Sequence, residues 1–206
     1  MKCERLGAER WSSAVSEWGA RAGLKPPAQG SRVPANGAGH AARRGRGRTF
    51  LMDLTWVTGR IAVGGGIWNA TNMAEVAQAG VTHIVDMQIE FDDTELAGPH
   101  GIQVLWNPVD DDFQPKPPEI FQRGVDFVVR ALEERDSRLL IHCAAGVHRA
   151  PMMTLAVLGA LGWELGEAMR VMEGRRPEVD FAEVYVSSVE RFLEQRGRVA
   201  SPEVAG

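Results

Sequence analysis

From Thr55 onward, short β-branched apolar runs alternate with helical segments, and this alternation restricts the possible folds more than any other feature. Such runs are typical of buried strands, and they lie at 56–57, 60–63, 81–86, 102–106 and 138–142. Helices are expected between and after them, at 72–78, 121–132, 150–161, 165–173 and 181–194, with an acidic loop at 88–101. Strands joined by crossover helices predict an α/β, three-layer fold: a central, mostly parallel sheet of four to five strands, flanked by helices on both faces.

The two ends of the chain differ in charge. Residues 1–50 hold ten Lys or Arg and three Asp or Glu, whereas residues 51–206 hold 13 basic and 24 acidic residues. The basic segment is rich in Gly, Ala and Arg and has no lasting apolar period, so it cannot bury enough surface to offset its ordering entropy. We therefore expect a disordered leader over 1–50, one globular domain over 51–197 and a disordered tail over 198–206.

The leader leaves two alternatives open. The run 41–48, Ala-Ala-Arg-Arg-Gly-Arg-Gly-Arg, has the composition of a nucleic-acid or nuclear-import patch, although a solvated tail is the favoured interpretation. Met52 is a second candidate for the start of the protein, which would make the leader an upstream extension of the reading frame. The acidic domain itself disfavours nucleic acid and anionic lipid as partners.

Apolar runs and cysteines restrict the environment of the protein. The longest strongly apolar run, Met152 to Trp163, is shorter than the roughly 20 residues of a membrane span and is typical of a buried helix. Because Cys3 and Cys143 are the only cysteines, no disulfide framework is expected. These features favour a reducing, cytoplasmic location, and we expect a monomer with no membrane and no nucleic-acid partner.

The loop between the strand at 138–142 and the helix at 150–161 combines three features of a phosphate site. Cys143 ends a buried strand just before a helix N-terminus, where backbone N–H groups and the helix dipole favour a thiolate. Arg149 offers a planar fork to two phosphate oxygens. The residues between them allow the backbone to form a nest of N–H donors for a phosphate: Ala144, Ala145, Gly146, Val147 and His148.

Together these groups supply a nucleophile and an anion cradle, which is what transfer of a phosphoryl group to sulfur requires. The alternative is that Cys143 is a small buried hydrophobe, the commonest role of a cysteine at a strand end. His142 before it, Gly146 in the loop, a strand before and a helix after make the catalytic interpretation the stronger one.

The run from His142 to Pro151, HCAAGVHRAP in one-letter code, resembles the signature loop of the Cys-based protein tyrosine phosphatases, His-Cys-x5-Arg. The Ala-Gly of the loop, the compact size and the upstream spacing are similar to the dual-specificity branch, especially its small atypical members. The resemblance covers about residues 53–195. It implies hydrolysis of phosphate monoesters through a phosphocysteine on Cys143, with Arg149 binding the phosphate, and we expect no cofactor.

The family resemblance also implies a general acid on a loop before the cysteine. The stretch 108–113, PVDDDF, offers Asp110, Asp111 and Asp112, and alignment on the family pattern favours Asp111. A carboxylic acid there would protonate the leaving oxygen and later take a proton from the attacking water. The alternative is that the acidic triplet is a solvated turn.

The histidines receive lesser roles. His142 is expected to support the loop by hydrogen bonding, and His148 either touches the substrate or faces solvent. The remaining His40, His83 and His100 show no ligand spacing, so no metal site is expected.

One residue departs from the family pattern, and the substrate is open. Ala150 follows the arginine where most members have Ser or Thr, whose hydroxyl helps the thiolate to leave; a plant subset acting on phosphorylated glucans resembles this chain in its Arg-Ala-Pro. The expected substrate is a protein phosphorylated on Tyr, Ser or Thr, or a small phosphoester. The alternatives are a catalytically weak module that binds phosphorylated partners, a phosphatase of a non-protein substrate such as a phosphoglucan, and sulfur transfer on a rhodanese-like loop.

Overall fold

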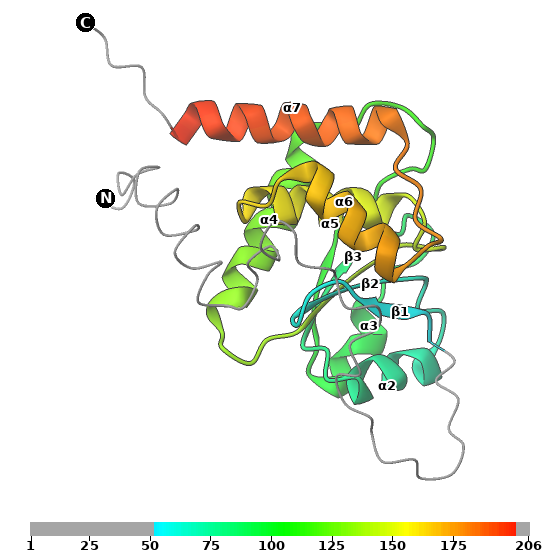
Figure 1. Cartoon of the computed structure of the whole chain (residues 1–206). Coiled ribbons are helices and arrows are strands. Elements are labelled where there is room, and N and C mark those ends of the chain that lie inside the picture. The colour runs from blue at the N-terminus through cyan, green and yellow to red at the C-terminus, as the bar shows by residue number, and fades with distance from the viewer. Residues whose placement is uncertain (1–51, 201–206) are drawn as a thin grey trace, which may run out of the picture.

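The computed structural model describes residues 52–200, which form a sheet with helices packed on both of its faces (Figure 1). The expected leader, residues 1–50, and residues 201–206 of the expected tail lie outside the described residues, while residues 198–200 end a helix. Among the described residues, no helix is both long enough and apolar enough to cross a membrane.

The sheet has five strands in the order β1-β2-β5-β3-β4. Strands β2, β5, β3 and β4 run parallel, and only β1 pairs antiparallel, with β2. The predicted mostly parallel sheet is therefore confirmed. The strand bounds are Leu54–Trp56 for β1, Ile61–Gly64 for β2, His83–Asp86 for β3, Gln103–Trp106 for β4 and Leu139–His142 for β5.

The helices divide between the two faces of the sheet, which confirms the three-layer arrangement. Helices α2 (Ala70–Gln78) and α3 (Thr94–Ala97) cover one face through the apolar cluster that includes Met73, Val76 and Ile84. The larger cluster lies on the other face, beneath α4 (Pro118–Glu133), α5 (Arg149–Ala160), α6 (Leu165–Arg175) and α7 (Glu183–Ala200). The expectation of a plain loop over 88–101 was wrong, because α3 and a 3₁₀ turn at Gly98–His100 lie within it.

Local signals explain where the helices begin and which face they bury. Asn69 caps α2, since its side chain accepts the N–H of Asn72 at 3.0 Å. In α4 the apolar stripe that includes Phe121 and Val128 is fully buried against the sheet. Helix α5 is buried almost all round, as the uniformly apolar run predicts, because α4, α6 and α7 all pack against it.

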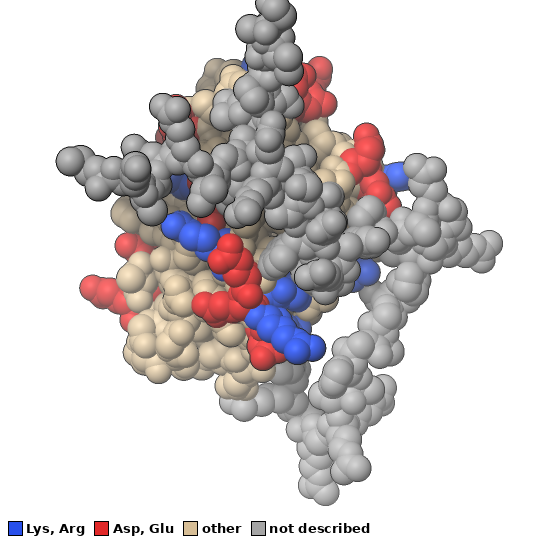
Figure 2. All heavy atoms as spheres, turned by 90° about the vertical axis from the view of Figure 1, so that its left-hand side faces the viewer, with Lys and Arg blue, Asp and Glu red and all other residues tan. Residues whose placement is uncertain are grey.

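The topology places one loop at the centre of the carboxyl edge of the sheet. Strand β5 lies between β2 and β3, and α5 starts within a few residues of its end. Ligands of open α/β sheets bind at this edge, outside the carboxyl ends of the strands. On the face shown in Figure 2, acidic and basic side chains lie close together, so their charges partly cancel there.

Candidate active site

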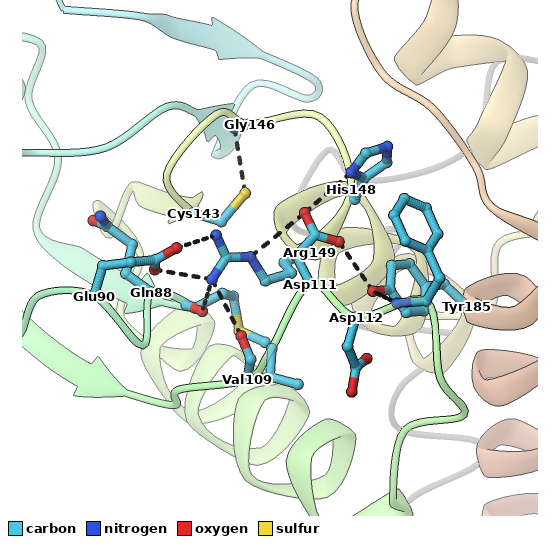
Figure 3. Close-up of polar contacts among 12 residues, drawn as sticks. Gln88, Glu90, Val109, Asp111, Asp112, Cys143, Gly146, His148, Arg149 and Tyr185 are labelled. Carbon is cyan, nitrogen blue, oxygen red and sulfur yellow. Dashed lines mark hydrogen bonds and ion pairs between the residues drawn. The ribbon is translucent and has the colours of Figure 1, made fainter.

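The loop after β5 curls around the Cys143 sulfur. The Cys143 side chain is only 1% exposed, and the backbone N–H of Gly146 donates to Sγ at 3.3 Å (Figure 3). Gly146 has a φ of 66°, and a Cβ there would fall 2.6 Å from the carbonyl oxygen of Gly64. Glycine is therefore required for the loop to close so tightly over β2.

The carbonyl groups of this loop point outward and are held from outside. The N–H of Gly66 donates to the Ala144 carbonyl at 3.0 Å. Arg176 donates through Nη2 to the Ala145 carbonyl at 3.3 Å and through Nε to the Gly146 carbonyl at 3.0 Å. Because a trans peptide directs its C=O and its N–H to opposite sides, the following N–H groups turn toward the sulfur and form the cradle.

Arg176 is itself held by Asp53, from the segment just before β1. Its Nη1 and Nη2 donate to the two Asp53 carboxylate oxygens at 2.6 and 2.5 Å. Hydrogen bonding to Asp53 raises the pKa of Arg176 despite its burial. A permanently charged guanidinium thus lies behind the loop and adds positive potential to the cradle.

Arg149 turns from the first turn of α5 toward the same cradle. Its Nη2 and Nη1 donate to the two Glu90 carboxylate oxygens at 2.8 and 3.0 Å, and Nη1 also donates to the Val109 carbonyl at 3.2 Å (Figure 3). Nε is buried and has no hydrogen-bond partner among the described residues. Nε–H and the second hydrogen of Nη2 lie on one edge of the guanidinium, and this edge, which Asp111 faces at 3.9 Å, makes no hydrogen bond from Nε and can receive an anion.

Arg149 stays protonated and positively charged. Burial opposes it, but the hydrogen bonds to Glu90 and the neighbouring Cys143 and Asp111 more than offset this, so the pKa of Arg149 is raised. An anion in the cradle would therefore meet a full positive charge in a poorly solvated place, where a charged hydrogen bond is strong.

Of the three candidate acids, the structure brings Asp111 to this site. Its Oδ2 lies 3.9 Å from Nε of Arg149, and its Oδ1 accepts the Tyr185 hydroxyl at 3.0 Å (Figure 3). The Tyr185 oxygen in turn accepts the Phe113 N–H at 2.9 Å. Burial raises the pKa of Tyr185 to about 12, so its hydroxyl stays a donor to the carboxylate.

The neighbours of Asp111 point elsewhere. Asp112 pairs with Lys116, and this hydrogen bond lowers the pKa of the Asp112 carboxyl. Asp110 is exposed at the surface. A lowered pKa makes Asp112 a poor proton donor near neutral pH, and Asp111 is the one of the three that lies close to Arg149, at 3.9 Å, so the geometry favours Asp111 as the acid.

His148 bridges two carboxylates at the side of the site rather than facing solvent. Its Nδ1 lies 3.1 Å from Oδ2 of Asp111, and its Nε2 lies 3.2 Å from Oδ2 of Asp180. The backbone N–H of Asp180 also donates to the Val147 carbonyl at 2.9 Å. The variable part of the loop is thereby joined to the Asp111 segment.

A buried group of ionisable side chains lies behind the cysteine. Nε2 of His142 is 2.9 Å from Asp93 and 3.6 Å from Asp86, and all three side chains are fully buried. Asp86 accepts the backbone N–H groups of Gln88 at 2.8 Å and Asp93 at 3.3 Å, while burial raises its pKa to about 6. His142 thus lies against two carboxylates, and its expected role in supporting the loop by hydrogen bonding stays a prediction.

The same three residues are the group within the described chain whose ligand atoms lie close enough to hold a metal ion, all within 4.8 Å of one another. Nε2 of His142 lies within ion-pair distance of Asp93, although neither side chain makes a hydrogen bond among the described residues. The expectation of no metal stays a prediction.

Sequence reasoning missed several of these residues. Glu90 lies in the acidic loop directly after a predicted strand, and its position at the carboxyl edge of the sheet was the available signal. Tyr185 lies within the predicted helix 181–194, but no motif in the sequence marks it as a partner of the general acid. Nothing local in the sequence marks the pairing of Arg176 with Asp53, because the two residues are 123 positions apart.

These features define a Cys-based phosphatase, and comparison with known proteins agrees. The family model of the dual specificity phosphatase catalytic domain matches residues 66–194. The chain therefore belongs to the dual specificity phosphatase family, as the signature loop predicts.

Curated relatives share part of the chain. Protein phosphatase Slingshot of Drosophila melanogaster is 26% identical over 129 residues, which are 62% of this chain and 12% of the relative. A probable rhodanese domain-containing dual specificity protein phosphatase of Dictyostelium discoideum is 32% identical over 94 residues, 46% of this chain and 19% of the relative. The chain thus corresponds to less than a fifth of the length of either relative.

Solved structures share the fold. PTPMT1 in complex with PI(5)P has a TM-score of 0.64 and 15% identity, covering 72% of this chain and 99% of that one. The active form of Tk-PTP has a TM-score of 0.61 and 20% identity, covering 69% and 97%. Human DUSP28 has a TM-score of 0.59 and 20% identity, covering 69% and 93%. At these identities the likeness establishes the fold alone.

Proposed function

We propose that this chain hydrolyses phosphate monoesters through a phosphocysteine on Cys143, with Arg149 binding the phosphate and Asp111 acting as general acid and base. The observation that carries this proposal is the convergence of Cys143 and Arg149, from the loop between β5 and α5, with Asp111, from the loop after β4, around one cradle of backbone N–H groups. The Gly146 N–H already donates to the sulfur at 3.3 Å, and Nε of Arg149, 3.9 Å from Asp111, makes no hydrogen bond among the described residues.

In the first step the Cys143 thiolate attacks phosphorus. The S–P bond forms while the bond from phosphorus to the leaving oxygen breaks, and Asp111, entering as the acid, gives its proton to that oxygen. The three non-bridging oxygens receive the N–H groups of residues 145–147 and the free edge of Arg149. Glu90 holds the guanidinium in the plane that this requires, at 2.8 and 3.0 Å.

In the second step water attacks the phosphocysteine. Asp111, now a carboxylate, takes a proton from the water; the O–P bond forms, the S–P bond breaks, and the thiolate returns with inorganic phosphate as the product. Tyr185, whose hydroxyl donates to Asp111 at 3.0 Å, keeps the carboxylate over the site through both steps.

We further propose a phosphorylated protein as the substrate and a reducing, cytoplasmic location. A thiolate nucleophile needs a reducing compartment to stay active. The solved structure of PTPMT1 carries PI(5)P, an anionic lipid. Residues 51–206 hold 24 acidic and only 13 basic residues, and this negative net charge argues against an anionic lipid as the substrate of this chain.

Hydrolysis of p-nitrophenyl phosphate in the presence of EDTA tests the mechanism. We expect activity that vanadate blocks, that Cys143→Ser abolishes and that Arg149→Ala nearly abolishes. Cys3→Ser is the matched control and should retain full activity. A requirement for added metal, or full activity in Cys143→Ser, would rule the mechanism out.

A further inference from the structure

The exposed large apolar side chains of the described residues all gather at one edge of the sheet. Five such side chains are 38 to 52% exposed: Trp68, Ile89, Phe91, Trp106 and Phe113. Each of them ends, or follows closely, one of the parallel strands β2, β3 and β4 at its carboxyl end. The loop that forms the cradle lies at this same edge, so the five residues border it, and we call them the apolar rim.

Three rim residues surround Glu90, the partner of Arg149. Ile89 and Phe91 are its chain neighbours and are 50% and 38% exposed. Trp106 ends the adjacent strand β4, and its indole N–H donates to the Gln88 carbonyl at 2.8 Å. The Trp106 ring is therefore fixed beside the loop that orients the phosphate-binding arginine, while 44% of the residue stays exposed.

Trp68 touches the cradle from the β2 side. A Cβ on Gly66 would fall 2.5 Å from the Trp68 indole, so the ring lies against the Gly66 backbone. The Gly66 N–H in turn donates to the Ala144 carbonyl of the cradle at 3.0 Å. One residue thus separates the exposed indole from the loop that binds the anion.

Phe113 completes the rim on the side of the general acid. Its ring meets His148 edge-on at 5.0 Å and stacks on Tyr185 at 5.8 Å. Its φ of 55° makes it the one non-glycine residue of the described chain in the left-handed region. Bulky residues adopt this conformation at a cost, and such strain concentrates at functional sites. Here it accompanies a ring that stays 50% exposed.

Large apolar side chains gathered on one face, and rigidly held, are typical of a binding surface rather than of ordinary surface composition. Aromatic side chains such as tryptophan and phenylalanine also contribute much of the binding energy at such surfaces. The charges of the loops that carry the rim indicate which kind of partner binds there. Two exposed carboxylates of the rim loops, Asp92 and Asp110, have no cationic partner among the described residues, whereas Glu90 pairs with Arg149 and Asp112 with Lys116.

The nearby cations, Lys116 in the loop after β4 and Arg123 on α4, are engaged. Lys116 binds Asp112, and the Nε of Arg123 donates to Asn107 at 3.0 Å. An anionic membrane would therefore meet an acidic surface and be repelled. A peptide carrying apolar and basic side chains beside its phosphorylated residue would satisfy both the rim and the carboxylates.

Resting on the proposed function, we propose that the substrate is a phosphorylated protein segment whose residues next to the phosphorylated side chain are apolar and basic, and that the apolar rim binds these residues. The phosphate enters the cradle, the apolar neighbours pack on rim side chains, and the basic neighbours face the carboxylates of the same loops.

The test compares three phosphotyrosine peptides with identical lengths and with flanks that are apolar and basic, small and neutral, or acidic. Rates are measured by phosphate release from the full chain, with p-nitrophenyl phosphate as the small substrate. We expect kcat/KM for the apolar and basic peptide to exceed that for the acidic peptide by about 10-fold or more, or about 1.4 kcal/mol. Added salt should shrink the difference, since charge contributes to it.

Two rim variants and one surface control locate the binding. Phe91→Ser and Trp68→Ser should each lower the ratio of the peptide's kcat/KM to that of p-nitrophenyl phosphate, mainly through KM, by about 5- to 10-fold. Gln103→Ala, exposed at the opposite end of β4, should leave this ratio unchanged.

Three results would overturn the inference. These are equal rates for the three peptides, an unchanged ratio in both rim variants, or faster hydrolysis of a monophosphorylated phosphoinositide in phosphatidylcholine vesicles than of any peptide. The last result would assign the rim to a membrane. Failure to hydrolyse even p-nitrophenyl phosphate would instead reject the proposed phosphatase mechanism.

Discussion

Both carboxylate oxygens of Glu90 accept hydrogen bonds from Arg149, at 2.8 and 3.0 Å. Glu90 lies in the loop after β3, the strand next to β5. This pairing uses the terminal nitrogens of the guanidinium and leaves Nε directed elsewhere. A fork held in this way loses little orientational freedom when phosphate arrives, and such preorganisation favours binding.

Replacing Glu90 by Gln should therefore weaken phosphate binding. An amide keeps one acceptor and loses the charge, so the guanidinium can rotate away from the cradle. We expect kcat/KM to fall by about 10- to 100-fold, the equivalent of one charged hydrogen bond, and the inhibition constant for vanadate to rise in parallel. Glu95→Gln, an exposed carboxylate of α3, is the control and should match the wild type. Unaltered vanadate inhibition in Glu90→Gln would show that Arg149 needs no such partner.

The second prediction concerns the leaving group. Asp111→Asn removes the proton donor but keeps the hydrogen bond from Tyr185, so the loop should stay in place. We expect a loss of about 10²- to 10⁴-fold for tyrosyl or alkyl phosphates, and a much smaller loss for p-nitrophenyl phosphate, whose leaving group needs less protonation.

Asp110→Asn and Asp112→Asn are the matched controls for this experiment. Asp112 pairs with Lys116 and Asp110 is exposed, so both variants should stay close to wild-type rates on all substrates. An equal loss on good and poor leaving groups in Asp111→Asn would mean that the residue only positions the loop.

The fold was largely predictable because its signals are local. Four of the strands are short apolar runs, and the buried α5 is a continuous apolar segment, so period and composition identify them. The exceptions are short: α3 has four residues and lies in a stretch whose charge pattern resembles a loop.

The site was predictable only in part. Cys143, Gly146 and Arg149 share one motif, so their contacts follow from their spacing. Glu90 reaches Arg149 across 59 positions, and Tyr185 reaches Asp111 across 74, so these partners depend on strand order and helix packing. A single sequence carries no direct signal of either, which is why the supporting residues emerged only with the fold.

The third prediction concerns the N-terminal boundary. A chain that starts at Met52 keeps Asp53, which holds Arg176 at 2.6 and 2.5 Å. We expect it to retain the melting temperature and activity of the full chain. A chain that starts at Leu54 loses this carboxylate. The buried Arg176 would then keep its hydrogen bonds to the cradle carbonyls but have no carboxylate partner from Asp53 for its charge.

For the shorter chain we expect a lower melting temperature and about a 10-fold loss of kcat/KM, because Arg176 is buried and would lose its half-exposed carboxylate partner. Asp53→Asn in the full chain should reproduce the loss. Equal activity of the two truncated chains would show that Arg176 orders the cradle without Asp53.

The fourth prediction concerns stability and pH. Burial raises the pKa of Asp86 from 3.8 to about 6, so the folded protein holds a proton that the unfolded chain has released between these values. The unfolded state binds fewer protons in this window, and the contribution of Asp86 to stability therefore falls as pH rises through about 4 to 6. Asp86→Asn cannot ionise and escapes this loss.

We therefore expect the melting temperature of Asp86→Asn, relative to wild type, to increase between pH 5 and pH 7.5, by the equivalent of about 1 kcal/mol. Asp136→Asn, an exposed carboxylate, should show no such trend. Parallel melting curves for wild type and Asp86→Asn across this range would mean that His142 keeps Asp86 ionised throughout.

The last prediction concerns breakdown of the phosphocysteine, which depends on how well the thiolate leaves. Ala150 is fully buried at the start of α5 and offers no hydroxyl, while the Thr154 hydroxyl one turn later donates to the Ala150 carbonyl at 2.9 Å and is thus occupied. Hydrolysis of the intermediate should then be the slow step. Stopped-flow measurement with p-nitrophenyl phosphate should show a burst of nitrophenolate followed by slower turnover.

In Ala150→Ser a hydroxyl can hydrogen-bond the departing thiolate, so steady turnover should rise and the burst should shrink relative to it. Ala156→Ser, also buried in α5, should leave the burst unchanged. If the wild type shows no burst and Ala150→Ser brings no gain, the first step limits the reaction and the missing hydroxyl has no kinetic consequence.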